Sequence, residues 1–330
     1  MTFRLRALGW LRAVGLVSLL IVQGASAQEF PNRAITFNVP FPPGGSADVI
    51  ARLIGAKLSE SLKQPVVIEN RGGGAGIVAM QAAAKSPPDG HTIVLGHIGT
   101  LAINPAMYDK LGYDPVADFT PVSLLVSVPN LIVVHPSVPA TTLAELVALA
   151  RAKPGTINYG SAGNGSAAQL SMEYLKQVAK LDKDSMPHVP YRGTGPMLAD
   201  LLGGQIQMTF TGSIAVLSHV KAAKLRPIAV GGAKRLELLP DVPTVAEAGF
   251  PGFETAQWYG ALVPAGTPTA IVERLSKAMA AALAQPEVAA RFRAEGSEPV
   301  GSTPAAFAGF IANEAARWGS VVKTAGIKPD

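Results

Sequence analysis

Two glycine-containing turns in the chain carry the residue types that bind anions. The first reads FPPGGSAD at residues 41–48, and the second reads YGSAGNGS at residues 159–166. Each follows a β-rich apolar run and precedes a segment of helical period, so each places backbone N–H groups and a serine hydroxyl at a helix N-terminus. The helix dipole and these N–H groups favour a bound carboxylate or phosphate. A plain turn with an N-cap serine remains an alternative for each.

Phosphate and nucleotide motifs are incomplete. Gly160 and Gly165 have the spacing of a P-loop, but Ser166 stands where the motif requires a lysine for the β- and γ-phosphates. The glycine run at residues 71–76 resembles a dinucleotide loop only loosely, because Ile77 occupies the third glycine position. We expect this run to be a turn that leads into a helix near Ile77, with a ligand contact as the alternative.

Catalytic and metal-binding sets are also missing from the sequence. The chain has no cysteine, no G-x-S-x-G and no H-E-x-x-H. His91 and His97 flank a predicted strand on one face, but no carboxylate at matching spacing completes a metal site, and His135, His188 and His219 are isolated. The sequence therefore predicts no metal, no cofactor and no enzymatic activity.

The N-terminus has the pattern of a secretory signal peptide. Arg4, Arg6 and Arg12 precede an apolar run at residues 13–22, which is followed by Ala25-Ser26-Ala27. The run is well short of the roughly 20 residues that span a bilayer, and no lipid-accepting cysteine follows it. We predict cleavage after Ala27 and a protein that diffuses freely in the periplasm.

The charge balance excludes a polyanionic partner. The full chain of 330 residues has a net charge of +5, and without the three arginines of the signal peptide 25 basic residues face 23 acidic ones, a net charge of +2. No block of like charges remains. Neither nucleic acid nor a membrane surface is therefore an expected partner.

Strand and helix patterns alternate along the mature chain, which is typical of an α/β protein with mainly parallel sheets. Helices are predicted from residue 46 onward and at 144–151, 167–178, 197–202, 214–223, 269–284 and 304–323. Strands are predicted at 35–41, 66–69, 92–96, 131–134, 157–159, 206–210 and 225–230.

A mature chain of 303 residues suits two domains better than one, yet no linker or repeat is visible. The apolar run at residues 121–135, interrupted at Pro129, is long for one strand and suits a chain that crosses between domains. A return near residues 250–258 would complete the hinge. We therefore expect one lobe from residues 28–128 with 253–330, and a second lobe from residues 129–252.

Several motifs, in this order along the whole chain, resemble the Bug receptors, the periplasmic solute-binding proteins of tripartite tricarboxylate transporters. The signal peptide and the ending RWGSVV at 317–322 belong to this resemblance. The internal motifs that carry it are PNRAITFNVPFPPGGSAD at 31–48, VIENRGG at 67–73, PDGHT at 88–92, AINPAMY at 102–108, VPYRGTGP at 189–196 and LPDVPTVAEAG at 239–249.

The resemblance implies a two-lobed type II periplasmic-binding-protein fold, each lobe a mainly parallel sheet flanked by helices, that closes over a small carboxylate. It also implies that two turns hold one carboxylate through backbone N–H groups and bridging waters, which corresponds here to residues 41–46 and 161–166. Two departures affect the distal pocket. Residues 74–76 read Gly-Ala-Gly where the family commonly has Gly-Gly-Asn, and residues 211–213 read Thr-Gly-Ser where Asp-Asn is frequent.

Because neither turn contains Lys or Arg, we expect anion capture to rest on N–H donors and hydroxyls. Asp48 could instead stabilise its helix dipole, and Thr100 could cap a helix. Arg192 fits either a ligand cation or a solvated surface charge. The predicted ligand-binding residues are Phe41, Gly44, Gly45, Ser46, Asp48, Thr100, Ser161, Ala162, Gly163, Asn164, Gly165, Ser166, Tyr191, Gly193, Thr194, Thr211 and Ser213.

These observations predict a monomeric receptor that captures a small organic carboxylate and delivers it to membrane transporter subunits. A ligand-sensing module that presents its closed form to a sensor kinase is a second interpretation. A secreted hydrolase is a third, but it would need a nucleophile and base that the sequence does not pair.

Overall fold

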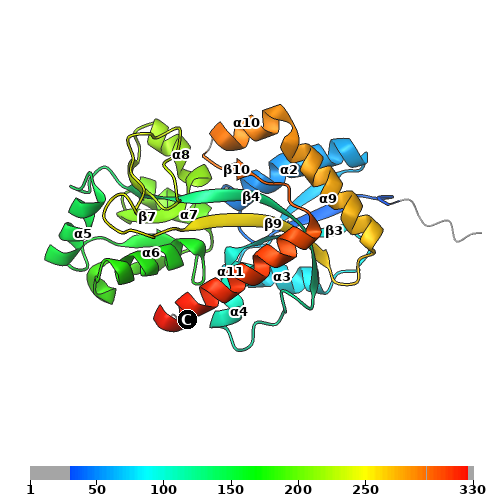
Figure 1. Ribbon diagram of the computed structural model, residues 1–330, viewed down its shortest axis with the longest axis horizontal. Helices are drawn as coiled ribbons and strands as arrows, with labels where there is room; N and C mark the ends of the chain where they lie inside the picture. The colour runs from blue at the N-terminus through cyan, green and yellow to red at the C-terminus, as the bar shows by residue number, and fades with distance from the viewer. Residues whose placement is uncertain (1–29, 295, 326–330) are drawn as a thin grey trace, which may run out of the picture. The chain divides into compact units, whose positions relative to one another are not determined.

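The computed structural model describes residues 30–294 and 296–325, so the predicted signal peptide lies outside the described residues. The chain divides into two units between residues 32 and 33. All elements discussed below belong to the second unit (Figure 1).

The first three strands form a parallel group. Strand β1 (Ile35–Val39) lies between β2 (Val66–Asn70) and β3 (Thr92–His97). Helix α2 (Ser46–Leu62) connects β1 to β2, and α3 (Ile77–Ala84) connects β2 to β3. Along α2 the buried residues Ile50, Ile54 and Leu58 recur every fourth position, which places them on the one face that packs inward. This region, with its strands parallel, will be called the β1 end of the sheet.

Two long antiparallel strands continue the sheet. Strand β4 (Phe119–Val134) has 16 residues, and β9 (Ala256–Pro264) pairs with it from Phe119–Pro264 to Pro129–Ala256. Strand β9 also pairs with β3 in antiparallel register. The sequence predicted only residues 131–134 of β4 as a strand, but the ladder continues through Pro129. The two long strands run side by side through the centre of Figure 1.

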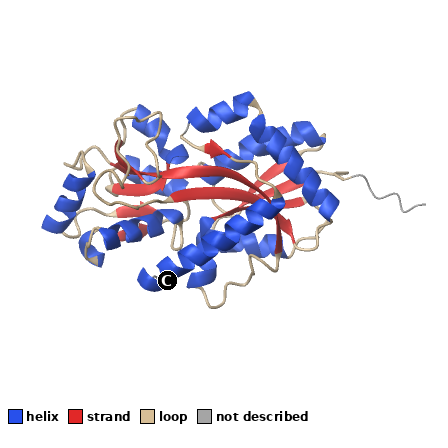
Figure 2. Ribbon diagram, viewed as in Figure 1, coloured by secondary structure: helices blue, strands red, loops and turns tan. Residues whose placement is uncertain are grey.

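The remaining strands form the β5 end of the sheet. Here β5 (Tyr159–Ser161) lies between β6 (His188–Pro190) and β7 (Met208–Gly212) in parallel register, while β7 and β8 (Arg226–Val230) pair antiparallel with β4. The sheet order is β2-β1-β3-β9-β4-β7-β5-β6. The α/β class is confirmed, but the sheet is mixed, because antiparallel β4 and β9 stand between the two parallel groups (Figure 2).

Helices cover the sheet at both ends. Those between β4 and β8 are α5 (Leu143–Ala152), α6 (Ala167–Val178), α7 (Thr194–Leu202) and α8 (Ser213–Lys221). The later ones are α9 (Thr269–Ala284), α10 (Pro286–Ala294) and α11 (Pro304–Ala325), with the short strand β10 (Glu298–Pro299) between the last two. Both α6 and α9 have the bounds that the sequence predicts. The predicted strands at 157–159 and 206–210 begin two residues later than expected, at Tyr159 and Met208.

Three short helical segments had no prediction. They are a 3-10 turn (Gly74–Gly76), a π-helical turn (Gly99–Ile103) that continues into α4 (Asn104–Met107), and a 3-10 turn (Lys183–Ser185). The first two lie beside the candidate site.

The apolar core consists of several buried clusters, one of which reaches both ends of the sheet. One buried cluster joins residues of the β1 end to α11, including Trp258, Phe307 and Trp318. Two further clusters lie at the β5 end, around Phe210 and Leu201 respectively. The first cluster also contains Ala167 and Leu170 of α6, so it continues from the β1 end to the β5 end.

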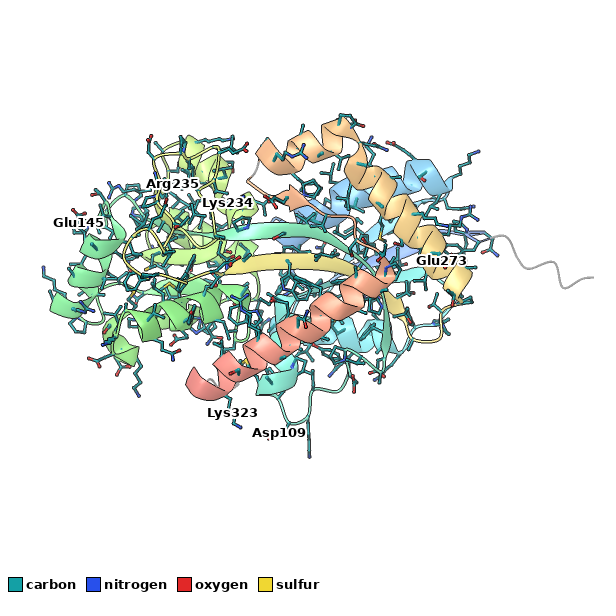
Figure 3. The ribbon with its side chains drawn as sticks, in the orientation of Figure 1. Asp109, Glu145, Lys234, Arg235, Glu273 and Lys323 are labelled. Atoms are coloured by element: carbon teal, nitrogen blue, oxygen red, sulfur yellow. The ribbon has the colours of Figure 1, made fainter. Side chains whose placement is uncertain are left out.

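Charged side chains of both signs are spread over different elements. Figure 3 labels Asp109, Glu145, Lys234, Arg235, Glu273 and Lys323, which lie on separate parts of the fold, and Arg235 is paired with Glu247 at 2.9 Å. Among the described residues, no helix combines the length and apolar character that a membrane span needs.

Candidate functional site

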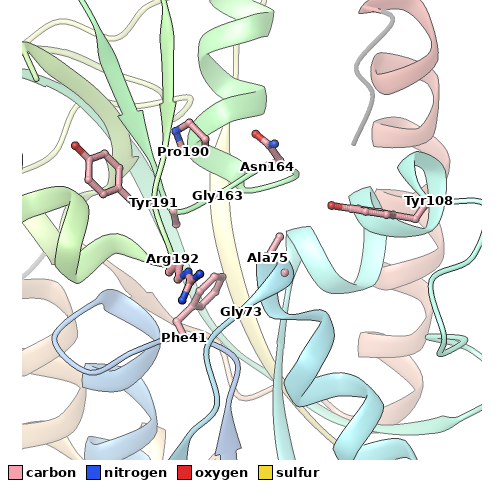
Figure 4. Close-up of a pocket in the computed structure, with 11 residues that line it drawn as sticks. Phe41, Gly73, Ala75, Tyr108, Gly163, Asn164, Pro190, Tyr191 and Arg192 are labelled. Carbon is pink, nitrogen blue, oxygen red and sulfur yellow. The ribbon is translucent and has the colours of Figure 1, made fainter. Parts of the chain in front are cut away.

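A cavity of about 320 Å³ lies where loops from both ends of the sheet meet. From the β1 end it is lined by Phe41 after β1, Gly73 to Ala75 after β2, and Tyr108 after α4. From the β5 end it is lined by residues 162–164 after β5 and by residues 190–192 at the end of β6 (Figure 4). Ligands of open α/β sheets bind at such carboxyl ends of strands.

Five predicted site residues line this cavity, and the other twelve do not. Those in the wall are Phe41, Ala162, Gly163, Asn164 and Tyr191. Those outside it are Gly44, Gly45, Ser46, Asp48, Thr100, Ser161, Gly165, Ser166, Gly193, Thr194, Thr211 and Ser213.

The prediction missed six lining residues outright or left them as alternatives: Gly73, Gly74, Ala75, Tyr108, Pro190 and Arg192. Gly73, Gly74 and Ala75 belong to the glycine run that was expected to be a plain turn, and Tyr108 follows the unpredicted α4. The position of the glycine run directly after a predicted strand is the signal that could have identified it.

Asp48 stabilises the conformation of the first turn, to which it belongs. The Asp48 carboxylate is buried and accepts hydrogen bonds from the Gly44 N–H (3.1 Å), the Asn70 amide (3.0 Å) and the Arg52 guanidinium (3.0 Å). Burial acts to raise the pKa of Asp48, but these hydrogen bonds, led by that from Arg52, hold it below its usual value. The acid is therefore satisfied within the protein and shapes the turn.

The start of α2 is enclosed by protein. Ser46 is buried, and its hydroxyl lies near the phenol of Tyr259, which also accepts a hydrogen bond from Gln257. No acceptor within the described chain engages the N–H groups of residues 45–47. A Cβ at Gly45 would lie 3.2 Å from Cβ of Thr194, so the turn packs directly on the start of α7.

The second turn is held by a chain of polar contacts. The Gly165 N–H donates to Gln169 Oε1 (2.8 Å), and the Gln169 amide nitrogen lies 3.4 Å from Nδ1 of His188. His188 Nε2 is in turn 2.6 Å from the Ser161 hydroxyl, which also accepts from the Gly163 N–H (3.1 Å). All these contacts lie on one side of the turn, behind the cavity wall.

These contacts fix the tautomer of His188. Since Gln169 Oε1 accepts from the backbone, its NH₂ group must face Nδ1, which therefore carries no proton. The proton of the neutral ring is then on Nε2 and is donated to the Ser161 hydroxyl, which itself donates to the carbonyl of Gly163 (3.1 Å). Sequence reasoning had treated His188 as isolated.

Most polar groups of the second turn are thus already engaged. The Ser166 hydroxyl accepts from Gln169 N at 3.4 Å and caps α6, and the Ser166 N–H donates to the carbonyl of Gly163 (3.1 Å). Within the described residues, the N–H groups of Ala162 and Asn164 have no acceptor. Because both residues line the cavity, these are the backbone donors that the turn offers there.

Four predicted residues have structural partners elsewhere. The Thr100 hydroxyl bridges the N–H and carbonyl of His97, and the Ser213 hydroxyl donates to the carbonyl of Gly296. Thr211 is buried in β7, while the phenol of Tyr191 donates to Asp200 on α7 at 2.7 Å. Tyr191 reaches the cavity wall with its phenol already engaged.

Among the described residues that line the cavity, Arg192 is the only charged one. Its side chain lies beside the ring of Phe41 in Figure 4 and is largely exposed. No hydrogen bond or ion pair to the part of the chain that the structure describes engages its guanidinium. The sequence left open whether Arg192 is a ligand cation or a solvated surface charge, and an exposed side chain in the cavity wall fits both interpretations.

Glycines let the two ends of the sheet approach each other around the cavity. A Cβ at Gly195 would lie 2.8 Å from the carbonyl oxygen of Pro43, and one at Gly99 would lie 2.9 Å from the carbonyl oxygen of Gly165. Gly193, at φ +129°, would bring a Cβ within 2.7 Å of the Pro42 ring. Side chains at these positions would keep the two ends apart.

Metal chemistry has no support in the described ranges 30–294 and 296–325, where no group of three His, Cys, Asp or Glu side chains is placed to hold an ion. Burial lowers the pKa of His97 to about 3, so this histidine stays neutral. Its Nδ1 accepts a hydrogen bond from Gly99 N at 2.9 Å.

Comparisons with known proteins place this arrangement among transport receptors. The family described as the tripartite tricarboxylate transporter family receptor matches residues 50–327. The protein BugT of Bordetella pertussis is 37% identical over 311 residues, which cover 93% of this chain and 94% of that protein.

Solved structures agree with the sequence comparison. The R. palustris protein Rpa4515, solved with adipate, has a TM-score of 0.88 and 42% identity over 92% of this chain and 100% of that one. MatC from Rhodopseudomonas palustris, solved with bound malate, has a TM-score of 0.84 and 36% identity over 89% of this chain and 100% of that one. The expected periplasmic-binding-protein fold is thereby confirmed.

Proposed function

The chain belongs to the tripartite tricarboxylate transporter family of receptors, and from this premise we propose that it is a periplasmic protein that captures a small organic carboxylate in the cavity beside Arg192. The observation that carries the proposal is the cavity itself, in which one unpaired cation and unengaged N–H groups from the second turn face a common space. A carboxylate matches this set in charge and in hydrogen-bonding capacity.

The polar contacts account for the carboxylate end of the ligand. The N–H groups of Ala162 and Asn164 and the guanidinium of Arg192 can each donate to it. Hydrogen bonds to a charged group are worth about 1.5–3 kcal/mol each when water is excluded. Together they supply the charge and the direction that the site needs without a metal.

Apolar walls account for the rest of the ligand. Phe41, Tyr108 and Pro190 line the same cavity, and they offer flat surfaces to a carbon skeleton. The adipate-bound and malate-bound relatives differ in chain length and hydroxylation, so the family supports the carboxylate class and leaves the skeleton open.

We further propose that residues 28–128 with 253–330 and residues 129–252 form two lobes that close over the acid. The apolar cluster around Leu201, whose members all lie within residues 129–252, and the glycine contacts between residues 42–45 and 193–195 support this division. We also propose delivery to a tripartite membrane transporter, which the family supports. The monomeric state stays a prediction.

A sensor kinase that recognises the closed form remains the second candidate partner. Deletion of the transporter's membrane subunits separates the two, because uptake of the bound acid should then stop while a sensor response would continue.

A hydrolase is the third candidate, and the Ser161–His188 pair is its best support. However, His188 donates its Nε2 proton to Ser161 and so is not positioned as a base for it. Ser161 is also fully buried. We therefore expect no turnover of activated esters above a Ser161→Ala control, and measurable serine-dependent turnover would revive the hydrolase.

A thermal-shift screen of the mature protein tests the proposal. Adipate, malate, citrate, benzoate and nicotinate cover the relevant chain lengths and shapes. A ligand at 100 times its Kd adds about 2.7 kcal/mol to stability. At least one organic acid should raise the melting temperature in wild type and less so in Arg192→Ala. No shift with any acid, in protein that unfolds cooperatively, would contradict the proposal.

A further inference from the structure

His188 does not line the cavity, yet it is bonded to the turn that does. We propose that His188 is a positioning residue whose neutral form holds the second turn in its binding shape, so that carboxylate affinity falls when His188 is protonated. This inference rests on the proposed function, because it concerns the affinity of the same cavity.

The contacts around His188 link three residues of the turn. Through Gln169 the ring reaches the N–H of Gly165, and through Ser161 it reaches both the N–H and the carbonyl of Gly163. Ala162 and Asn164, which line the cavity and whose N–H groups have no acceptor among the described residues, stand between these anchored positions. The orientation of the cavity's backbone donors therefore depends on the anchors on either side.

Gly163 shows why the turn needs such anchors. Its φ of +123° lies in a region that only glycine enters freely, so its intrinsic conformational freedom is large. The hydroxyl of Ser161 restricts it by accepting from its N–H and donating to its carbonyl, both at 3.1 Å. That hydroxyl is itself oriented by His188.

Protonation of His188 would disrupt this hydrogen-bond network at the contact between Nδ1 and the amide nitrogen of Gln169. A proton on Nδ1 would face the NH₂ group of Gln169, and two donors repel each other. Rotation of the Gln169 amide would relieve the repulsion, but it would replace the oxygen that accepts from Gly165 with a second donor. Either outcome removes one anchor of the turn.

The titratable groups on the neighbouring elements engage one another. Strand β6 is at the edge of the sheet, and β5 and α6 pack against His188. From β5 the ring of Tyr159 stacks on the imidazole at 4.8 Å, and its phenol donates to Glu173 of α6. Glu173 is in turn paired with Lys176 at 3.0 Å, and burial raises the pKa of Tyr159, so the phenol stays neutral.

The tautomer can be tested without any ligand. Long-range ¹H–¹⁵N spectra of the mature protein at pH 7.5 should show His188 with its proton on Nε2 and with Nδ1 unprotonated. In the same sample, the amide signals of Gly163 and Gly165 should shift with the titration of His188 between pH 8 and pH 5. A proton on Nδ1 at pH 7.5, or glycine amides that do not follow His188, would overturn the inference even if acids bind.

Two variants then separate positioning from mere stability. His188→Gln keeps a side-chain donor for Ser161 but cannot be protonated, and Gln169→Glu keeps the acceptor for Gly165 while removing the NH₂ group that opposes a proton on Nδ1. Both should bind adipate in calorimetry at pH 7.5 and keep that affinity at pH 5.5. Wild type should lose affinity for adipate by up to about tenfold for each pH unit below the pKa of His188.

His135→Gln is the matched control, because His135 also contacts a serine, Ser137 at 2.7 Å, but lies outside the cavity wall. It should retain the pH dependence of wild type. If adipate binding by His188→Gln and by Gln169→Glu remains as pH-sensitive as in wild type, the inference fails. If wild type does not bind adipate at any pH, the choice of probe and the proposed function are in question, while the ligand-free spectra still decide the role of His188.

Discussion

The carboxylate of Asp48 accepts a hydrogen bond from the N–H of Gly44, 3.1 Å away, four residues earlier in the same turn. The acid thus occupies a donor that would otherwise be available to an anion. Arg52 and Asn70 bind the remaining lone pairs of the carboxylate, and Asn70 also donates to the carbonyl of Phe41 (3.0 Å). Through these contacts Asp48 fixes the path of the backbone next to a cavity-lining side chain.

Asp48→Asn should destabilise the protein at neutral pH by about 1–3 kcal/mol, because a charge-assisted set of hydrogen bonds is weakened. The pKa of Asp48 is below its usual value in the folded protein, so its contribution is complete above about pH 4 and is lost as the pH falls through the folded pKa. The stability difference between wild type and variant, measured by urea unfolding, should therefore shrink below pH 4. A constant difference from pH 7 to pH 2.5 would contradict this assignment.

Gly163→Val should reduce carboxylate affinity more than Arg192→Ala. Valine is strained at φ +123°, and its Cβ would lie 3.0 Å from the carbonyl oxygen of Tyr191, so the turn and its donors must move together. We expect losses of about a hundredfold and about tenfold respectively, measured by calorimetry with the acid identified in the screen. Arg274→Ala, on the exposed face of α9, is the control. Loss of binding in Arg192→Ala with normal binding in Gly163→Val would replace the backbone mechanism by an arginine clamp.

Gly195→Ala should hinder closure without harming the fold. The added methyl group would lie 2.8 Å from the Pro43 carbonyl oxygen, whereas alanine suits the backbone of α7. Wild type should show a smaller radius of gyration in X-ray scattering with a saturating acid, and the variant should show less contraction and weaker binding. Gly309→Ala in α11, where nothing lies within 4 Å, is the matched control. Equal contraction in all three proteins would sink this prediction.

His97 should make the protein sensitive to acid. Burial lowers its pKa to about 3 in the folded protein, whereas an unfolded chain binds the proton near pH 6.5. Its contribution to stability is therefore complete above pH 6.5 and declines as the pH falls toward 3, by about 1 kcal/mol per pH unit. His97→Asn keeps an acceptor for Gly99 N but cannot titrate, so its stability should change less from pH 6.5 to pH 4, although the lost ring packing on Phe41 lowers it at pH 7. His219→Asn, on α8, is the control.

The sequence predicted correctly those elements whose ends are set by nearby residues, such as a helix-capping serine. Ser166 caps α6 and the apolar spacing defines its length, so its bounds agree with prediction. Strand β4 was predicted only in part, because its continuous apolar run has no period and Pro129 argues against a central strand. What admits Pro129 is its pairing with β9, a contact between segments more than a hundred residues apart.

The candidate site was predicted at the level of turns but not of atoms. Helix-terminus physics identified both turns, yet it cannot show which N–H groups the protein itself uses, as Asp48 and Gln169 do. The pairing of Ser161 with His188 spans 27 residues and exists only because β5 and β6 are neighbours. Tyr108 depends on a short helix that carries no periodic signal.

The path of the chain also sets an order of assembly during export. Strands β1 to β3 are made first, but β9, which flanks β3 and carries Trp258, arrives only after residue 255, and Phe307 and Trp318 complete the same core later still. In the export that we propose, a chain that crosses the membrane from its N-terminus would expose an unfinished sheet edge at β3 for most of its passage. The β5 end is nearly contiguous in sequence and can mature first. The earliest segment to cross the membrane would thus be among the last to be buried, and it would be the part of the nascent protein most in need of protection from aggregation.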